Sequence, residues 1–314
     1  MRDVAVISFS QLLVDKAEAN DAELVMPVVR EALGRAGLQK QDIGFTCSGS
    51  SDFLTGMPFS FVGALDAVGP WPPIEESHVE MDGAWALYEA WVRLQHGDID
   101  TALVYAFGRS TLGPIEDILA LQLDPYYEAP MWPDATSLAA LQARALLDSG
   151  RLSDSDKKKA TAEPPKIVDG AAAVVLASGD RARKLCSRPA FISGIDHRIE
   201  SHLLGVRDLS HSVSTEIAAK HAGRFEKSPT FAELHAPYSA QELILCDALK
   251  LDKQVTINPS GGAQNNNAVM VAGLIRIGEA ATRVSNREAD CALAHASSGP
   301  CLQQNLICML EARA

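Results

Sequence analysis

The chain has 314 residues, of which 47% are hydrophobic, so it is long enough to bury a substantial core as one large domain or two fused halves. Its formal net charge of -12 argues against nucleic acid as a ligand. No stretch reaches the roughly 18 apolar residues of a membrane span, and we expect a cytoplasmic protein.

Apolar, β-branched runs alternate along the chain with segments of helical periodicity. The runs that predict strands cover 4–9, 43–46, 102–107, 171–177, 190–195, 231–234, 255–257, 292–296 and 306–310. Helical periodicity covers 22–36, 83–95, 214–221, 240–249 and 268–281. This alternation is typical of the α/β class.

The segment HVEMDGAWALYEAW, residues 78–91, has the strand–turn–helix pattern that often holds a catalytic nucleophile, but its turn carries no nucleophilic side chain. A short polar strand end runs into Asp82, Gly83 and Ala84, and apolar residues then recur at helical spacing. The first turn of a helix stabilises a thiolate through its unpaired N–H groups and its dipole, but this turn carries no cysteine. Asp82 is either a helix N-cap or a carboxylate that orients an imidazole from another turn.

Residues 147–165, LDSGRLSDSDKKKATAEPP, form the most polar and least complex stretch of the chain and are the best candidate boundary. On either side of it a weak internal repeat appears. The segment that begins HVEMDGAW and the segment that begins INPSGGAQ each read as a polar turn, a helix, an acidic turn and an apolar strand. A duplicated core explains this pattern, with polar turns of both halves facing a shared pocket.

Four polar residues of the second half are candidates for chemistry. His235 follows one apolar run and His295 lies near the end of another, so each is either a general base at a strand's carboxyl end or a histidine bonded to backbone. Asn267 either helps to form an oxyanion hole or caps the helix that follows. Tyr238 is either an acid or base, or a packed aromatic.

The six cysteines form no CxxC pair and have no histidine companion at metal-ligand spacing, so we expect reduced thiols and no metal site. Cys47, at the end of a predicted strand, reads as a buried small thiol. Ser260, Gly261 and Gly262 fit no nucleotide-binding loop and indicate a tight turn.

Several blocks, in order along nearly the whole chain, resemble those of one protein family. AELHAPYSAQELI, INPSGGAQNNNAVMVAG and ALAHASSGPCLQQN resemble the three C-terminal signature blocks of the thiolase superfamily. CSGSSDFLTG, HVEMDGAWALYEA, ALQLDPYYEAPMWPD and DGAAAVVLAS are similar to its lipid-transfer-protein-like, sterol-carrier-type branch, which includes the thiolase-like subunit of steroid side-chain aldolases. The resemblance implies a duplicated αβαβα fold with halves at 1–123 and 166–314 and a shortened loop domain at 124–165.

Compared with this family, the chain lacks the catalytic residues that Claisen condensation requires. The position that matches the acyl-accepting cysteine is taken to be Gly83, and the block that holds a Gly-His-Pro reads Asn266-Asn267-Ala268. The third block offers His295 near the place of the acid/base cysteine, with Cys301 six residues later. The short 124–165 segment implies that a partner chain helps to bind coenzyme A.

The resemblance therefore implies a lyase that splits a β-hydroxyacyl-CoA into a ketone and a shorter acyl-CoA, which needs a base and an oxyanion hole but no nucleophile. The implied assembly is a homodimer that joins a small OB-fold and zinc-ribbon protein in a heterotetramer. The coenzyme A thioester is the substrate, and no separate cofactor is expected. His235 is the first choice for the base. Substrate contacts are expected from the turn residues Gly83, Ser260, Gly261, Gly262 and Ser298. The alternative is a non-catalytic lipid-binding or scaffold subunit.

Overall fold

The computed structural model describes residues 1–69 and 75–313. Within them the strands are β1 Val4–Val14, β2 Phe45–Gly49, β3 Glu75–Val79, β4 Thr101–Gly108, β5 Asp169–Ser178, β6 Ala190–Ile199, β7 Phe231–Leu234, β8 Thr256–Ile257, β9 Cys291–Ser298 and β10 Gln304–Ala312. The α-helices are α1 Asp21–Ala36, α2 Asp52–Thr55, α3 Leu65–Val68, α4 Gly83–His96, α5 Ile115–Leu121, α6 Ala135–Asp148, α7 Asp154–Lys157, α8 Gly179–Leu185, α9 Val213–His221, α10 Ser239–Ala248, α11 Gly262–Asn265 and α12 Ala272–Ser285.

The strand order shows a duplication. From one edge the sheet runs β3-β2-β4-β5-β1, and it continues β6-β10-β9-β7-β8. Read from the opposite edge, the second set is β8-β7-β9-β10-β6. Each half therefore places its third, second, fourth, fifth and first strand along the chain in this order from the sheet edge inward. In both halves the first three strands of this order run parallel to one another. The fourth strand of this order pairs antiparallel with both the third and the fifth. The halves join where β1 and β6 pair at their ends.

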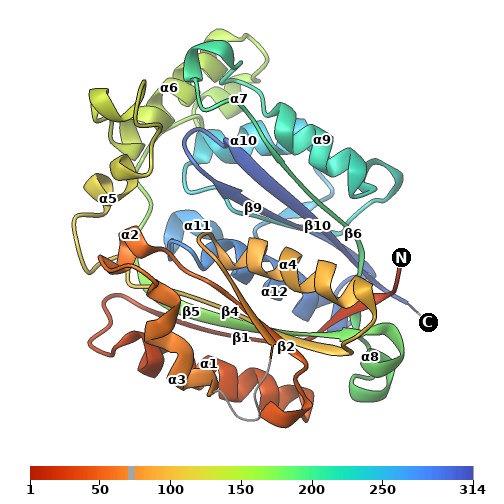
Figure 1. Ribbon diagram of the computed structural model, residues 1–314. Coiled ribbons are helices and arrows are strands. Elements are labelled where there is room, and N and C mark those ends of the chain that lie inside the picture. Colours follow the sequence, from red (N-terminus) through yellow and green to blue (C-terminus); the bar gives the residue numbers. More distant parts are fainter. Residues whose placement is uncertain (70–74, 314) are drawn as a thin grey trace.

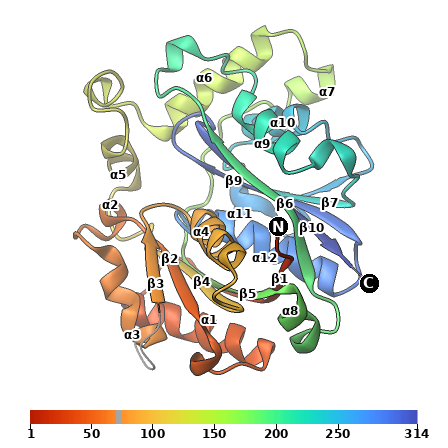
Figure 2. The same cartoon turned by 45° about the vertical axis from the view of Figure 1, so that its right-hand side comes forward.

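The helices form three layers around the two half-sheets (Figure 1). Helices α1 and α3 cover the outer face of the first half, and α9 and α10 cover the outer face of the second. Helices α4 and α12 lie between the halves, and the turned view keeps them there (Figure 2). This is the αβαβα arrangement that the sequence predicted, with both half-sheets lying against the central pair of helices.

The first half-sheet and the central helices are tightly packed because small residues let them approach closely. All ten residues of β5 are buried, and most of them are alanine or valine. On α12, a Cβ added at Gly278 would lie 2.1 Å from the ring of Phe9 on β1, so the glycine makes room for the aromatic side chain. The N-termini of α4 and α12 lie side by side, because the Asp82 carboxylate accepts hydrogen bonds from both, and each half contributes one of them.

The boundary of the halves differs from the predicted one. Strand β5 lies in the range 166–314 assigned to the second half, but it pairs with β4 and β1 of the first half. The first half therefore takes in Asp169–Ser178, and the segment inserted between its last two strands is 109–168, which contains α5, α6 and α7. The apolar pattern of β5 predicts a strand but carries no information on its partners. Helix α6 lies largely outside the predicted linker at 147–165.

Two further differences concern single elements. Strand β3 was predicted only as a short polar strand end before Asp82, because it is a polar, partly exposed edge strand without the apolar signal. The helix predicted at 268–281 begins at Ala272, after an irregular turn. Among the described residues no helix has the length and apolar character needed to cross a membrane.

Candidate active site

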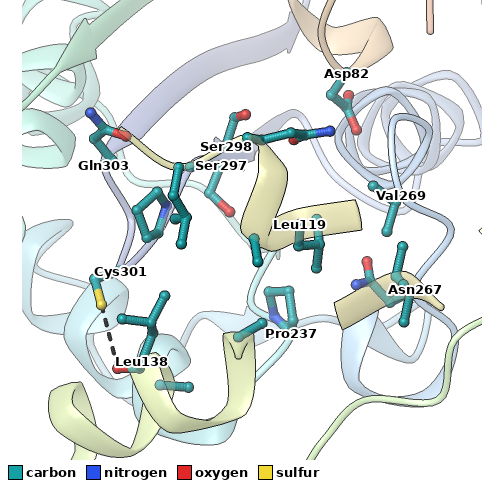
Figure 3. Close-up of a pocket in the computed structure, with 18 of the residues that line it drawn as sticks. Asp82, Leu119, Leu138, Pro237, Asn267, Val269, Ser297, Ser298, Cys301 and Gln303 are labelled. Carbon is teal, nitrogen blue, oxygen red and sulfur yellow. Dashed lines mark hydrogen bonds between the residues drawn. The ribbon is translucent and has the colours of Figure 1, made fainter. Parts of the chain in front are cut away.

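A cavity of about 470 Å³ lies where the two halves meet the segment between β4 and β5. Asp82 from the first half, together with His235 and Asn267 from the second, lines its polar side. Leu119 of α5 and Leu138 of α6 line its apolar side. Figure 3 shows Asp82 and Asn267 on one side of the cavity and Leu138 on the other. The shared pocket predicted from the two polar turns is therefore present.

His235 follows directly after β7 and reaches the cavity from there. Its side chain is engaged at both ring nitrogens. Nε2 lies 3.3 Å from Oδ1 of Asn267, and Nδ1 lies 3.4 Å from the backbone N and 3.5 Å from Oγ of Ser297. Burial lowers the pKa of His235 below its ordinary value, and the charge of Arg276 adds to this effect. The Asp82 carboxylate and the contact with Asn267 act in the opposite direction. A neutral imidazole can accept a proton.

Asn267 does not cap a helix, which corrects one of its two predicted roles. It forms an isolated parallel bridge with Ile167, and α12 begins five residues later at Ala272. Its backbone N donates to Lys166 O at 2.8 Å, which fixes the residue between the two halves. The side chain is nearly buried and lines the cavity beside His235. An amide in this place can orient an imidazole or donate to an oxyanion.

Asp82 is a helix cap of an unusual kind. Its Oδ1 accepts from the backbone N of Ala84 at 2.8 Å, in the first turn of α4. The same carboxylate accepts from Gly273 N at 2.9 Å and Leu274 N at 3.0 Å, in the first turn of α12. One buried anion therefore serves the N-termini of both central helices, where the helix dipoles favour negative charge. No hydrogen bond joins Asp82 to His235 or His295 among the described residues.

Gly83 does not line the cavity, and this corrects its predicted role as a substrate contact. A Cβ at Gly83 would lie 2.5 Å from Cβ of Ala106 and 2.9 Å from Cδ2 of Leu274. A side chain there would enter the packed core between β4 and α12. The residue of this turn whose side chain reaches the cavity is Asp82.

His295 is also wrongly predicted as a site residue. It lies inside β9, is fully buried, and is absent from the cavity lining. Its Nε2 lies 2.9 Å from Oδ1 of Asn305, whose amide nitrogen donates to Ser214 Oγ near the start of α9. Burial lowers the pKa of His295 to about 3, so it is a neutral structural histidine. Its neighbour Leu293 packs in the outer core under α9 and α10, and strand alternation puts His295 on the same face.

The turn at Ser260, Gly261 and Gly262 also lies away from the cavity. Ser260 instead binds a buried ion pair: its backbone N and Oγ donate to Glu233, and Arg276 donates to its Oγ at 2.7 Å. Arg276 also donates to Glu233 at 3.1 Å. This network joins Glu233 on β7 to Arg276 on α12. Substrate contact by these three turn residues is therefore not supported.

Ser298 and Tyr238 also line the cavity, while substrate contact by Ser298 and an acid or base role of Tyr238 stay predictions. Tyr238 precedes α10, and its hydroxyl lies 3.3 Å from Oγ1 of Thr136 on α6. Burial raises the pKa of Tyr238. Ser297, which precedes Ser298 at the end of β9, was missed although it lies against His235. The Ser297-Ser298-Gly299 turn was visible in the sequence, but nothing there showed which serine faces the imidazole.

The far side of the cavity is apolar. Cys301 lies there with its thiol donating to the backbone O of Leu138 at 3.4 Å, a contact drawn in Figure 3. Burial raises the pKa of Cys301 to about 12, so the thiol is not an activated nucleophile. None of the described residues that line the cavity is a lysine or an arginine, whereas Glu80 and Glu116 are among them.

The backbone around the cavity is strained. Met270, Cys301 and Leu302 line it and have positive φ values of 71°, 53° and 57°. Non-glycine residues in this conformation are uncommon and cluster at functional sites. Met270 O accepts from Gly83 N at 2.9 Å, so this strained turn also holds the start of α4.

No family model matches the sequence, and no curated protein matches it. Solved structures do match. A chain described as "Ltp2-ChsH2(DUF35) aldolase" has a TM-score of 0.77 and 15% identity, with 99% of this chain and 98% of that chain covered. Human mitochondrial 3-ketoacyl-CoA thiolase in complex with CoA has a TM-score of 0.73 and 15% identity, with 100% and 98% covered. A second structure of that human enzyme gives the same score and identity. The chain has the thiolase fold.

Proposed function

We propose that this thiolase-fold chain is the lyase subunit of a retro-aldol enzyme, which cleaves a β-hydroxyacyl-CoA to a ketone and a shorter acyl-CoA. The observation that carries the proposal is the neutral His235, held by Asn267 at the polar side of a cavity whose cysteine is not activated. A base without a nucleophile suits cleavage of a carbon–carbon bond rather than acyl transfer. The likeness to an aldolase chain supports the same reaction type.

In this reaction the proton of the β-hydroxyl passes to His235 and the bond between Cα and Cβ breaks. The electron pair forms the enolate of the thioester, and the proposed role of the Asn267 amide, which lines the cavity, is to donate to the enolate oxygen. Return of the proton to Cα completes the shorter acyl-CoA. Tyr238, at the cavity wall, is a second group that can supply this proton. The overall step consumes no water and no cofactor.

The apolar side of the cavity supports a bulky, uncharged acyl group, and we propose a steroid side-chain thioester on the strength of the sequence resemblance. A volume of about 470 Å³ lies in the range of pockets for drug-sized ligands. The phosphates of coenzyme A require cations, and none of the described lining residues supplies one. We therefore propose that a partner chain contributes these cationic side chains. The complex is proposed to act in the cytoplasm.

The partner is proposed to be a small OB-fold and zinc-ribbon protein, docked on what we name the 121–132 surface. This surface is defined by five large exposed side chains, Leu121, Tyr126, Tyr127, Met131 and Trp132. Aromatic residues and methionine are enriched in protein interfaces. Leu121 also lines the cavity, so a chain bound here would border the site. A second copy of this chain is proposed to bind along the edge strand β3, beside the exposed Phe53 and Phe59.

The test is co-purification with such a partner, followed by an assay for ketone release from β-hydroxyacyl-CoA thioesters. We expect release by the complex and not by either chain alone. A complex that binds the thioester but releases no ketone would favour the alternative of a non-catalytic lipid-binding subunit.

A further inference from the structure

Both ring nitrogens of His235 are already engaged in the folded chain. Nε2 lies 3.3 Å from Oδ1 of Asn267, and Nδ1 faces Ser297 through its backbone N at 3.4 Å and its Oγ at 3.5 Å. The residue is only 8% exposed. A substrate hydroxyl therefore has no open approach to either nitrogen unless one of these neighbours moves.

The two neighbours differ in what they can do with a proton. The amide of Asn267 accepts or donates hydrogen bonds but does not exchange protons readily in catalysis, whereas a serine hydroxyl is both donor and acceptor. Ser297 lines the cavity and is partly exposed, so its hydroxyl can touch a bound substrate and the imidazole together. At rest its Oγ donates to His235 O at 3.1 Å, which keeps it beside the ring.

We propose that the Ser297 hydroxyl is a catalytic residue, which relays the substrate's β-hydroxyl proton to Nδ1 of His235. This inference rests on the proposed lyase function. In the step, the β-hydroxyl proton moves to Ser297 Oγ as the Ser297 proton moves to Nδ1. The bond between Cα and Cβ breaks, its electron pair forms the enolate, and the β-oxygen becomes the carbonyl of the ketone. The proton held by His235 returns to Cα, so no other reactant is needed.

A proton relay and a nucleophilic serine differ in whether the substrate becomes covalently attached to the chain. If Ser297 attacked the thioester, an acyl group would become attached to Oγ and coenzyme A would leave. In the relay no covalent bond forms between substrate and chain. Ser297 is the next-to-last residue of β9, and its hydroxyl hydrogen at rest points to the backbone carbonyl of His235. The relay therefore requires the hydroxyl to rotate toward Nδ1, which lies 3.5 Å from Oγ.

The experiment compares Ser297→Ala and Ser297→Thr with wild type, each in complex with the partner chain. We expect Ser297→Ala to lower kcat by about a hundredfold or more with little change in KM, since loss of a general acid or base step costs about 10²- to 10⁴-fold. Ser297→Thr keeps a hydroxyl and should retain more activity than the alanine variant. The matched control is Ser193→Ala, because Ser193 is also a strand serine whose Oγ donates to a carbonyl, that of Met309. It should cleave at the wild-type rate.

Nuclear magnetic resonance of protein with ¹⁵N-labelled histidine gives a readout that needs no turnover. We expect the Nδ1 resonance of His235 to shift in Ser297→Ala and to stay in place in Ser193→Ala. An unchanged resonance, or near wild-type kcat in Ser297→Ala, would overturn the relay while leaving the lyase function intact. An acyl group found on Ser297 by mass spectrometry would overturn it in favour of a nucleophile. If no thioester is cleaved, the lyase function fails, and the relay fails with it whatever the resonance shows.

Discussion

At the scale of single residues, two histidines with the same sequence setting have different roles. His235 comes one residue after β7 and lines the cavity, whereas His295 lies within β9 and is buried under α9. Each keeps a neutral ring because burial lowers its pKa. His235 is the first residue after its strand and His295 lies three residues before the end of its strand, and this placement decides whether the ring reaches the cavity.

His235→Ala should lower kcat for ketone release by about a hundredfold or more, because a missing general base typically costs about 10²- to 10⁴-fold. Steady-state assays of the complex measure this. His96→Ala, at the exposed end of α4, is the control and should match wild type. Near wild-type kcat in His235→Ala would refute the assignment of the base.

The buried His295 should make stability depend on pH. Its folded pKa of about 3 lies below the ordinary value of about 6.5, so the unfolded chain takes up the proton first as the pH falls. Its contribution is complete above about pH 6.5 and is lost progressively down to about pH 3. Between pH 7 and pH 5 wild type should lose about 2 kcal/mol more than His295→Gln, as measured by urea unfolding. Equal losses in the two proteins would contradict this.

At the scale of elements, the N-termini of α4 and α12 are the feature that organises the cavity. Asp82 accepts hydrogen bonds from both, and Gly273 allows this because a Cβ there would lie 2.5 Å from Oδ1 of Asp82. At the start of α4 the Asp82 side chain therefore reaches the cavity. A side chain at the next position, Gly83, would point into the packed core.

Cysteine substitutions in this turn should therefore behave in opposite ways. Asp82→Cys places a thiol in the cavity at two helix N-termini, which lower thiol pKa values, so iodoacetamide should label it rapidly at neutral pH. Gly83→Cys forces a side chain against Ala106 and Leu274 and should cost about 1–3 kcal/mol of stability without becoming reactive. Mass spectrometry and thermal unfolding measure the two effects. Rapid labelling at Gly83→Cys would mean that the turn faces the cavity differently.

At the scale of the whole molecule, the cavity is built by three separate parts of the chain. The two halves supply its polar side, and α5 and α6 of the segment between β4 and β5 supply its apolar side. That segment also carries the 121–132 surface, so substrate enclosure and the proposed partner contact belong to the same part of the chain.

Trp132→Asp should weaken binding of the partner chain by at least about 2 kcal/mol, or roughly thirtyfold in Kd, because buried tryptophan is a frequent interface hot spot. Isothermal titration calorimetry measures this loss. The control is Ile217→Asp, which alters an exposed apolar side chain on α9, in the outer layer of the second half. Equal weakening by both substitutions, or by neither, would place the partner elsewhere.

The sequence by itself predicted the α/β class, the duplication and a pocket shared by polar turns of both halves, and His235, Asn267, Asp82 and Tyr238 line one cavity. These predictions follow from local patterns, because apolar periodicity and polar turns are encoded over a few residues. The tertiary structure alone decided that β5 pairs with β4 and β1, that His295 faces the outer core, and that Ser297 rather than Ser260 lies near the imidazole. Strand partners, the face of a buried strand and contacts between distant turns depend on long-range packing, which no local pattern records.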